Sequence, residues 1–237
     1  MSQADNPYLA ANFLSAAEAN VDDRASFITK TYLHLAGAIA AFVLLVTALI
    51  NSPFAEPLIQ SVLGTRYGYL ILFGGFMLVS WIAETWARSS TSLGMQYTGL
   101  GIYVVAEAIF MTPLMYLAAL QDPNILATAG VTTLGLFAVL TTIVFITRKD
   151  FSFLRSVLVF GGFAAFGLIL LNAFFGLTLG PIFTYAMIAF ACAYILYDTS
   201  NVLHHYRTTQ YVAASLALFA SVALLFWYIL QLFMSRD

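Results

Sequence analysis

Four ionisable side chains lie inside long apolar stretches of the 237-residue sequence: Glu84, Arg88, Glu107 and Asp198. An ionisable group in hydrocarbon is energetically expensive, so each of them needs a charged partner, a water-filled cavity or a function. Carboxylate oxygens also suit hard cations such as calcium. These four residues are therefore the first candidates for chemistry in this chain.

Glu84 precedes Arg88 by one helical turn, which places both side chains on one helical face with the acid before the base, the favourable order. One interpretation is an interfacial ion pair whose charges reach the lipid headgroups. The alternative makes Arg88 the counter-charge for an acid on a neighbouring helix. The sequence leaves both open.

Asp198 lies about five residues from the end of its apolar stretch, roughly 7–8 Å at the helical rise of 1.5 Å per residue. Arg88 ends an earlier apolar stretch at a similar depth, so the two side chains can meet. A single buried carboxylate either pairs with a cation or binds a proton, and both states depend on pH. Asp198 is thus either a structural ion-pair partner or a gate that faces the cation.

Glu107 is the deepest acid, near the bilayer midplane, so Asp198 and Glu107 are the two candidate ligands for a calcium ion. The histidines His204 and His205 follow at the end of the Asp198 stretch. No cysteine or acid stands at a metal-ligand spacing from them. Solvation at the interface accounts for this pair, with sensing of pH as the alternative.

The composition places these residues in a membrane protein. Hydrophobic residues make up 62% of the sequence and charged residues 8%, with a mean hydropathy of +0.90. A soluble domain is about 45–50% apolar and about 25% charged. A formal net charge of −2 excludes a basic nucleic-acid-binding protein. The expected partner is the lipid bilayer, and nucleic acid is not one.

Apolar runs separated by charges, glycines and prolines predict seven membrane-spanning segments. They are residues 31–51, 68–88, 96–120, 125–147, 153–175, 178–203 and 211–233. Unpaired backbone groups are not tolerated in lipid, and the runs lack the alternation of an outer-membrane barrel, so every segment must be a helix. The predicted fold is an all-α, seven-helix transmembrane bundle over residues 28–237, preceded by a polar cytoplasmic tail at residues 1–27.

The basic residues predict the orientation. If the tail is cytoplasmic, most lysines and arginines fall on the same side as the tail: Arg24, Lys30, Arg88, Arg148, Lys149, Arg155 and Arg207. Only Arg66 and Arg236 fall on the other side. By the positive-inside rule the N-terminus is cytoplasmic and the C-terminus lies outside.

Signatures of membrane enzymes and receptors are absent from the sequence. No lysine lies mid-span to form a Schiff base, and Asp198 has no Gly-x-Gly-Asp partner with which to share a proton. Neither a His-Glu-x-x-His helix nor a Gly-x-Ser-x-Gly turn occurs. We therefore expect neither an enzyme nor a bound cofactor, with calcium only as a transported ion.

The segment Tyr194–Asn201, with Asp198 after a tyrosine, and the upstream segment Gly176–Phe183 resemble the transmembrane Bax inhibitor motif family, also called Bax inhibitor-1. The resemblance extends from about residue 28 to 233 and is best to bacterial members. It implies outer helices around a central seventh span and a pH-sensitive calcium leak. It also implies that Asp198 pairs with an acid of the last span, and that Arg88 binds Asp198 when the pore changes state.

The second acid of that family pattern is missing here. The matching stretch, Leu218–Leu224, carries Ser221 in its place. Two adjacent carboxylates separate their titrations and so form a switch, whereas serine keeps a hydrogen bond without charge repulsion. Our hypothesis is that Glu107 supplies the second acid. The alternative is that the chain keeps the fold and has lost the switch.

Two functions remain open at this point. The first is a pH-sensitive calcium or cation leak channel in a bacterial inner membrane. Its pathway and gate would contain Asp198, Arg88, Glu107 and Ser221, with Glu84, His204 and His205 as secondary candidates. The second is a non-transporting regulator of the stress response or of membrane proteolysis, acting through its polar tail on a membrane-protein partner.

Overall fold

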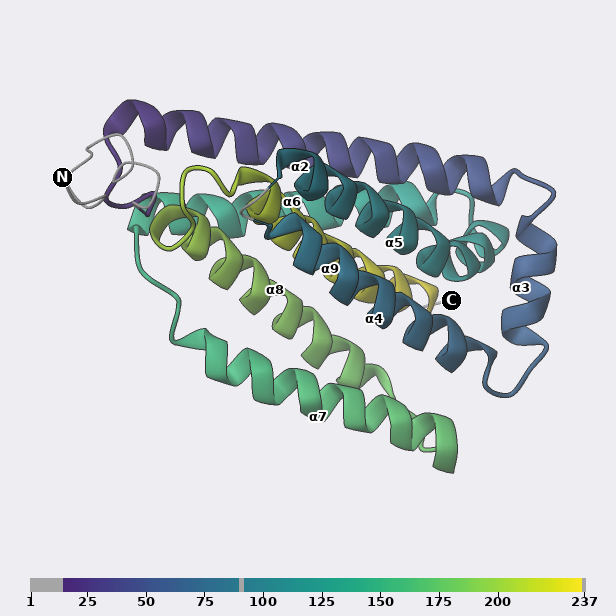
Figure 1. Ribbon diagram of the computed structural model, residues 1–237. Helices are drawn as coiled ribbons and strands as arrows, with labels where there is room; N and C mark the ends of the chain where they lie inside the picture. The colour runs from purple at the N-terminus through teal and green to yellow at the C-terminus, as the bar shows by residue number, and fades with distance from the viewer. Residues whose placement is uncertain (1–14, 90–91, 236–237) are drawn as a thin grey trace.

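The structure is a computed structural model, and it describes residues 15–89 and 92–235. Helices account for almost all of these residues (Figure 1). They are α2 (Val21–Ile50), α3 (Ala55–Leu63), α4 (Gly68–Ala87), α5 (Leu93–Gln121), α6 (Ile125–Thr147), α7 (Leu154–Phe175), α8 (Pro181–His204) and α9 (Tyr211–Met234).

Seven of these helices are long and apolar enough to cross a membrane, which confirms the predicted all-α, seven-span fold. The ends of six of them lie close to the predicted ends. The exception is α2, which begins at Val21 instead of residue 31. The Asn20 side chain caps it by accepting a hydrogen bond from the Asp23 backbone N–H at 2.8 Å. The helix therefore continues through part of the predicted tail, while residues 1–14 and Arg236 lie outside the described residues.

The connection between the first two spans contains a short helix, α3, that the apolar pattern did not predict. It buries Ala55, Ile59 and Val62, which recur at the spacing of one helical face. Pro57 is tolerated because it lies in the first turn, where a backbone N–H has no partner within the helix. Nine residues give too few turns for such periodicity to be recognised in the sequence.

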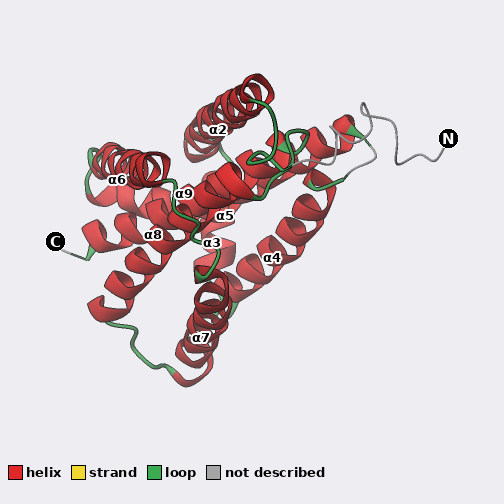
Figure 2. Ribbon diagram, turned by 90° about the vertical axis from the view of Figure 1, so that its left-hand side faces the viewer, coloured by secondary structure: helices red, strands yellow, loops and turns green. Residues whose placement is uncertain are grey.

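The last span, α9, is the centre of the bundle (Figure 2). Within its most apolar window 72% of residues are buried, against 56% in α5 and 28% or less in every other span. It packs against α2, α4, α5, α6 and α8. The central seventh helix that the resemblance implied is therefore observed. At the other extreme α7 lies at the edge, 6% buried, and packs mainly against α8.

Short connections make successive spans run in opposite directions, so several helix ends gather at each end of the bundle. The beginnings of α5 and α9 and the ends of α4 and α8 lie in the half of the bundle in which α2 begins (Figure 1). We call this the N-terminal end of the bundle. It brings together segments far apart in the sequence, among them the residues around Arg88 and Asp198.

Helices α4 and α5 approach most closely at Gly99. A Cβ atom at this position would lie 2.5 Å from the Ala83 carbonyl oxygen and 2.6 Å from the Ala87 nitrogen. Both are backbone atoms, so no side-chain rotation can relieve the contact. The missing side chain at Gly99 thus sets the distance between α5 and the last turn of α4, which carries Glu84 and Arg88.

We predict that Gly99→Ala lowers the free energy of unfolding of the purified protein, and with it the melting temperature. Overpacking usually costs about 1–3 kcal/mol, and the better helix propensity of alanine offsets up to about 1 kcal/mol of this cost. Gly135→Ala in α6 is the matched control, because no atom lies within 4 Å of the added Cβ. Melting curves in detergent measure both. Equal melting temperatures for the two variants would contradict the close approach.

Candidate functional site at the N-terminal end of the bundle

Asp198 of α8 and Ser221 of α9 form the centre of the candidate site. Asp198 is 8% exposed and Ser221 3% exposed. The Ser221 hydroxyl donates a short hydrogen bond to Oδ2 of Asp198. The residue that stands in place of the family's second acid therefore does contact the first. This contact ties the central helix α9 to α8 through a buried polar pair.

The Ser221 hydroxyl has a second acceptor within reach, the carbonyl oxygen of Ala217 one turn earlier in α9, at 3.1 Å. A hydroxyl has one proton to donate and two lone pairs with which to accept. When Asp198 is ionised, Ser221 donates to the carboxylate. When Asp198 is protonated, Ser221 accepts from it and donates to Ala217 instead. Ser221 is thus a hydrogen-bond partner for both protonation states.

Arg88 and Glu84 lie at the end of α4, both within electrostatic range of Asp198. Arg88 is the C-cap residue of α4 and is exposed. Among residues 15–89 and 92–235, no ion pair joins Arg88 to Glu84 or to Asp198. The structure therefore brings the three side chains into one region without the direct Arg88–Asp198 contact that the helix depths allowed.

Glu107 does not meet Asp198. It is 4% exposed, on the buried face of α5, and Asp198 has Arg88 and Glu84, not Glu107, as its charged neighbours. The reason is depth: fourteen residues from the start of α5 place Glu107 about 21 Å from the N-terminal end, whereas Asp198 lies about 9 Å from the end of α8. Glu107 is therefore not the partner acid of a carboxyl pair with Asp198 in this structure.

Tyr103 lies between the Asp198 region and Glu107 along the bundle. This buried residue of α5 lies one turn from Glu107 and beside Ser80 of α4. Glu84, Glu107 and Asp198 are all within its electrostatic range. Polar groups thus continue from Asp198 past Tyr103 to Glu107. Tyr103 was only one of several mid-span polar residues in the sequence, and nothing in its spacing marked it as central.

A segment before α2 covers this region. The backbone N–H of Ala16 donates to the carbonyl of Tyr206 at 2.8 Å, and Ser15 pairs with Arg207 in a single antiparallel bridge. Tyr206 lies in the connection between α8 and α9, where burial raises the pKa of its hydroxyl to about 12; Arg88 and Asp198 are among its charged neighbours. We call Ser15–Ala19 the N-terminal strap. The sequence did not reveal it, because its contacts are made by the backbone.

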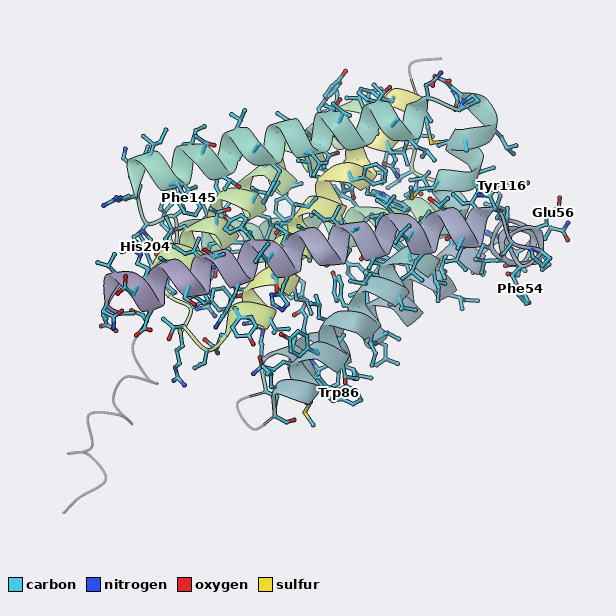
Figure 3. The ribbon with its side chains drawn as sticks, turned by 90° about the horizontal axis from the view of Figure 1, so that it is seen from above. Phe54, Glu56, Trp86, Tyr116, Phe145 and His204 are labelled. Atoms are coloured by element: carbon cyan, nitrogen blue, oxygen red, sulfur yellow. The ribbon has the colours of Figure 1, made fainter. Side chains whose placement is uncertain are left out.

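The two histidines point to different surroundings. His205 lies 3.0 Å from Asp150 through Nε2, whereas Nε2 of His204 is buried without a hydrogen-bond partner among the described residues. Figure 3 places His204 at the end where α2 begins, far from Glu56. The two imidazole rings still meet edge to face, with centroids 6.3 Å apart, so the histidines are neighbours with different hydrogen-bond partners, and pH sensing by the pair stays a prediction.

Asp150 connects the loop between α6 and α7 to the end of α8. The backbone N–H of Ser152 donates to it at 2.8 Å, and that of Phe151 donates to Ser200 of α8 at 2.8 Å. Slight burial acts to raise the pKa of Asp150, but the hydrogen bonds from Ser152 and His205 outweigh it and hold the pKa below its usual range. The Asp-x-Ser spacing is a turn signal in the sequence, although it did not single out this residue.

The possible calcium ligands are dispersed. Among the described residues no three or more His, Cys, Asp or Glu side chains converge as a metal site. Asp198 and Glu107 lie at different depths, so each would meet a cation separately.

Comparisons with known proteins agree with the fold. A family model described as "Inhibitor of apoptosis-promoting Bax1" matches residues 24–237. An uncharacterized protein of Pseudomonas aeruginosa is 29% identical over 223 residues, which are 93% of this chain and 94% of that protein. The Schizosaccharomyces pombe protein named Bax inhibitor 1 is 30% identical over 154 residues, 62% of this chain and 48% of its own. A BI1-like protein of Arabidopsis thaliana is 26% identical over 227 residues, 90% and 82% of the two chains.

We predict that Ser221→Ala lowers the free energy of unfolding by about 1–3 kcal/mol, because the buried Asp198 loses its hydrogen-bond donor. Ser215→Ala is the matched control on the same helix, since the Ser215 hydroxyl bonds only to carbonyls of its own helix. Chemical denaturation in detergent at neutral pH compares them. Equal losses would mean that the Ser221–Asp198 bond adds no stability.

We predict that Asp150 stabilises the fold at neutral pH and stops doing so in acid. Its folded-state pKa lies below the usual 3.8, so its contribution is present above that value and disappears as the pH falls through the folded-state pKa. The side chain is 45% exposed, which limits the contribution to at most about 1 kcal/mol. Asp150→Asn should therefore melt lower than the unaltered protein at neutral pH.

The two proteins should converge in acid, once the pH falls below the lowered folded-state pKa of Asp150, and Asp122→Asn in another loop supplies the control. A difference in melting temperature that persists unchanged into acid would contradict this assignment.

Proposed function

This chain belongs to the Bax inhibitor-1 family of membrane proteins, and on that premise we propose that it is a regulated leak pathway for calcium or related cations in a bacterial inner membrane. The observation that carries the proposal is the buried Asp198 carboxyl, bonded by Ser221 at the contact between α8 and the central α9. Buried carboxylates in spanning helices commonly mark ion or proton pathways.

Asp198 acts as the gate and as the acid that faces the cation. In its ionised form it offers hard oxygen ligands to calcium, and in its protonated form it offers no charge. Ser221 satisfies either form with one hydroxyl rotation, since Ala217 supplies the other acceptor. A single carboxyl with a serine partner can thus change protonation without unpacking α8 from α9.

Arg88 is the alternating partner. It is the C-cap residue that follows α4, within electrostatic range of Asp198 but without an ion pair to it. A small movement of the α4 end would bring the guanidinium to the carboxylate, and the ion pair would then compete with both the proton and the cation. Glu84, one turn earlier on α4, is the nearer second acid that could attract cations to this end.

Glu107 is a second acid farther along the same pathway. Tyr103 lies between it and the Asp198 region, so polar groups occur at successive depths of the bundle. The proposal therefore places Glu107 in series with Asp198, where the sequence hypothesis placed the two side by side.

The proposed orientation has the N-terminal end of the bundle in the cytoplasm. The connections at this end carry most of the basic residues, as the positive-inside rule requires. The full-length similarity to a Pseudomonas aeruginosa protein supports a bacterial inner membrane.

A second function, regulation of a membrane-protein partner, is favoured by one observation. The N-terminal strap is attached to the connection between α8 and α9 through Ala16 and Tyr206. A partner that bound the chain preceding the strap would act directly on the helices that hold Asp198 and Ser221. The relatives' names, which include a Golgi anti-apoptotic protein of vaccinia virus, are compatible with a regulatory role.

We predict that Asp198→Asn reduces calcium flux into proteoliposomes about tenfold or more, equivalent to roughly 1.4 kcal/mol of lost cation stabilisation. It should also remove the part of the pH dependence of flux that Asp198 confers, because the amide of asparagine neither binds nor releases a proton. A calcium-sensitive dye inside the vesicles measures both. Glu56→Gln is the control, because Glu56 is an exposed acid in α3, outside the spans.

Absence of calcium flux from the unaltered protein at every pH would contradict the leak pathway. In that case a chain lacking residues 1–14, which keeps the N-terminal strap, tests regulation: loss of the protein's effect in cells with an intact fold supports a partner bound through the tail. A Glu107→Gln variant with unaltered flux would remove Glu107 from the pathway and leave Asp198 in it.

A further inference from the structure

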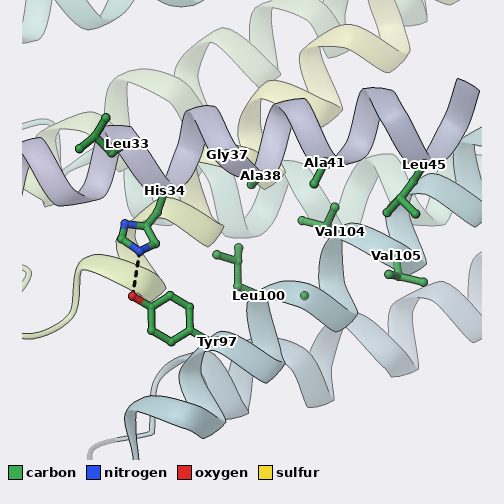
Figure 4. Close-up of a pocket in the computed structure, with 11 residues that line it drawn as sticks. Leu33, His34, Gly37, Ala38, Ala41, Leu45, Tyr97, Leu100, Val104 and Val105 are labelled. Atoms are coloured by element: carbon green, nitrogen blue, oxygen red, sulfur yellow. Dashed lines mark hydrogen bonds between the residues drawn. The ribbon is translucent and has the colours of Figure 1, made fainter.

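A groove lies between α2 and α5, on a face of the bundle that the proposed pathway does not use (Figure 4). Its volume is about 480 Å³, within the usual range of about 300–1,000 Å³ for small-ligand sites. Almost all of its lining is apolar. The residues that line it are Leu33, His34, Gly37, Ala38, Ala41, Leu45, Tyr97, Leu100, Gly101, Val104 and Val105.

The groove exists because small residues occupy facing positions. A Cβ atom added at Gly37 or at Gly101 would meet no other atom within 4 Å. By contrast, backbone atoms of α4 occupy the space beside Gly99. The space beside Gly37 and Gly101 is therefore open along membrane-spanning segments of α2 and α5, where the surrounding medium is lipid hydrocarbon.

One end of the groove is polar. Nδ1 of His34 lies 2.7 Å from the Lys30 carbonyl oxygen, so Nδ1 must donate, and the Tyr97 hydroxyl lies 2.8 Å from Nε2 (Figure 4). The ring of Tyr211 packs against His34 in a tilted arrangement, with centroids 5.1 Å apart. Lys30 Nζ lies 5.5 Å from the centroid of the Tyr211 ring.

Lys30 supplies the positive charge at this end. It is exposed, one turn of α2 before His34, or about 6 Å along the helix axis. No ion pair involves Lys30 among the residues that the structure describes. Both nitrogens of His34 already have partners, so the lysine ammonium is the group available to an anion.

We propose that this groove binds a phospholipid of the surrounding bilayer, with one acyl chain along Gly37 and Gly101 and an anionic headgroup at Lys30. A phospholipid has this layout: an apolar chain that begins at a negatively charged phosphate near the membrane surface. Lysine side chains at the ends of spanning segments extend toward that surface. The charge of Lys30 and the polar rim of Tyr97 and His34 complement the headgroup, and the small residues accommodate the chain.

The bound chain would also brace α5. Leu100 and Val104 line the groove, and Tyr103 and Glu107 are buried residues of the same stretch of α5. A lipid in the groove therefore packs against the part of α5 that carries these polar residues. Its binding does not depend on the proposed calcium leak.

Native mass spectrometry of the purified full chain tests the proposal, with phosphatidylglycerol and phosphatidylcholine added to the detergent. The unaltered protein should retain one phosphatidylglycerol molecule at least about tenfold more tightly than phosphatidylcholine, a difference of roughly 1.4 kcal/mol. Gly37→Leu and Gly101→Leu fill the groove and should abolish retention of this molecule. Lys30→Gln should keep a lipid but lose the preference for the anionic one.

Gly74→Leu is the matched control, because Gly74 of α4 is also exposed with no atom within 4 Å of an added Cβ. It should bind lipid as the unaltered protein does. Equal retention by Gly37→Leu and by the control would overturn the site, and equal affinity for the two lipids in the unaltered protein would overturn the headgroup assignment. A dimer that Gly37→Leu dissociates would show that a second copy occupies the groove.

Discussion

The burial of one carboxyl group between α8 and α9 is the constraint around which the rest of the bundle is arranged. A carboxyl in hydrocarbon requires hydrogen-bond partners in every protonation state, and here a single hydroxyl, that of Ser221, satisfies the requirement. That partner must come from the helix that other helices enclose, because an outer helix would expose the pair to lipid. The central position of α9 and the burial of Asp198 therefore depend on each other.

The neighbouring elements follow from the same requirement. Gly99 allows α4 to lie directly against α5, which brings Glu84 and Arg88 to the depth of Asp198. The N-terminal strap is attached to the connection between α8 and α9 by a hydrogen bond from the Ala16 backbone N–H to the Tyr206 carbonyl. Segments from separate parts of the chain thus gather near one carboxyl group: Ser221 bonds to it, Glu84 and Arg88 lie within electrostatic range, and the N-terminal strap bonds to the neighbouring Tyr206.

Much of this could be predicted from the sequence, and the remainder failed for identifiable reasons. The spans were found because charges and prolines end the apolar runs, and Ser221 was found because the family pattern has an acid at its position. Glu107 and Asp198 do not meet in the structure because they lie at different depths, a difference that counting residues along each helix could have shown, and a role for Glu107 as a second acid stays a prediction. The helix α3, the strap and Asp150 were missed because their contacts are short, made by the backbone or dependent on distant segments.

The peripheral helix α7 gives the bundle an asymmetric mechanical character. On its inner side α8 is held by α6 and α9, whereas on its outer side it meets α7, which is almost entirely surrounded by lipid. If α8 moved outward, α7 would have to move with it and displace the surrounding lipids. The resistance to such a displacement would come from membrane viscosity and lateral pressure, so acyl-chain order in the host membrane would set how fast the helix that bears Asp198 can move.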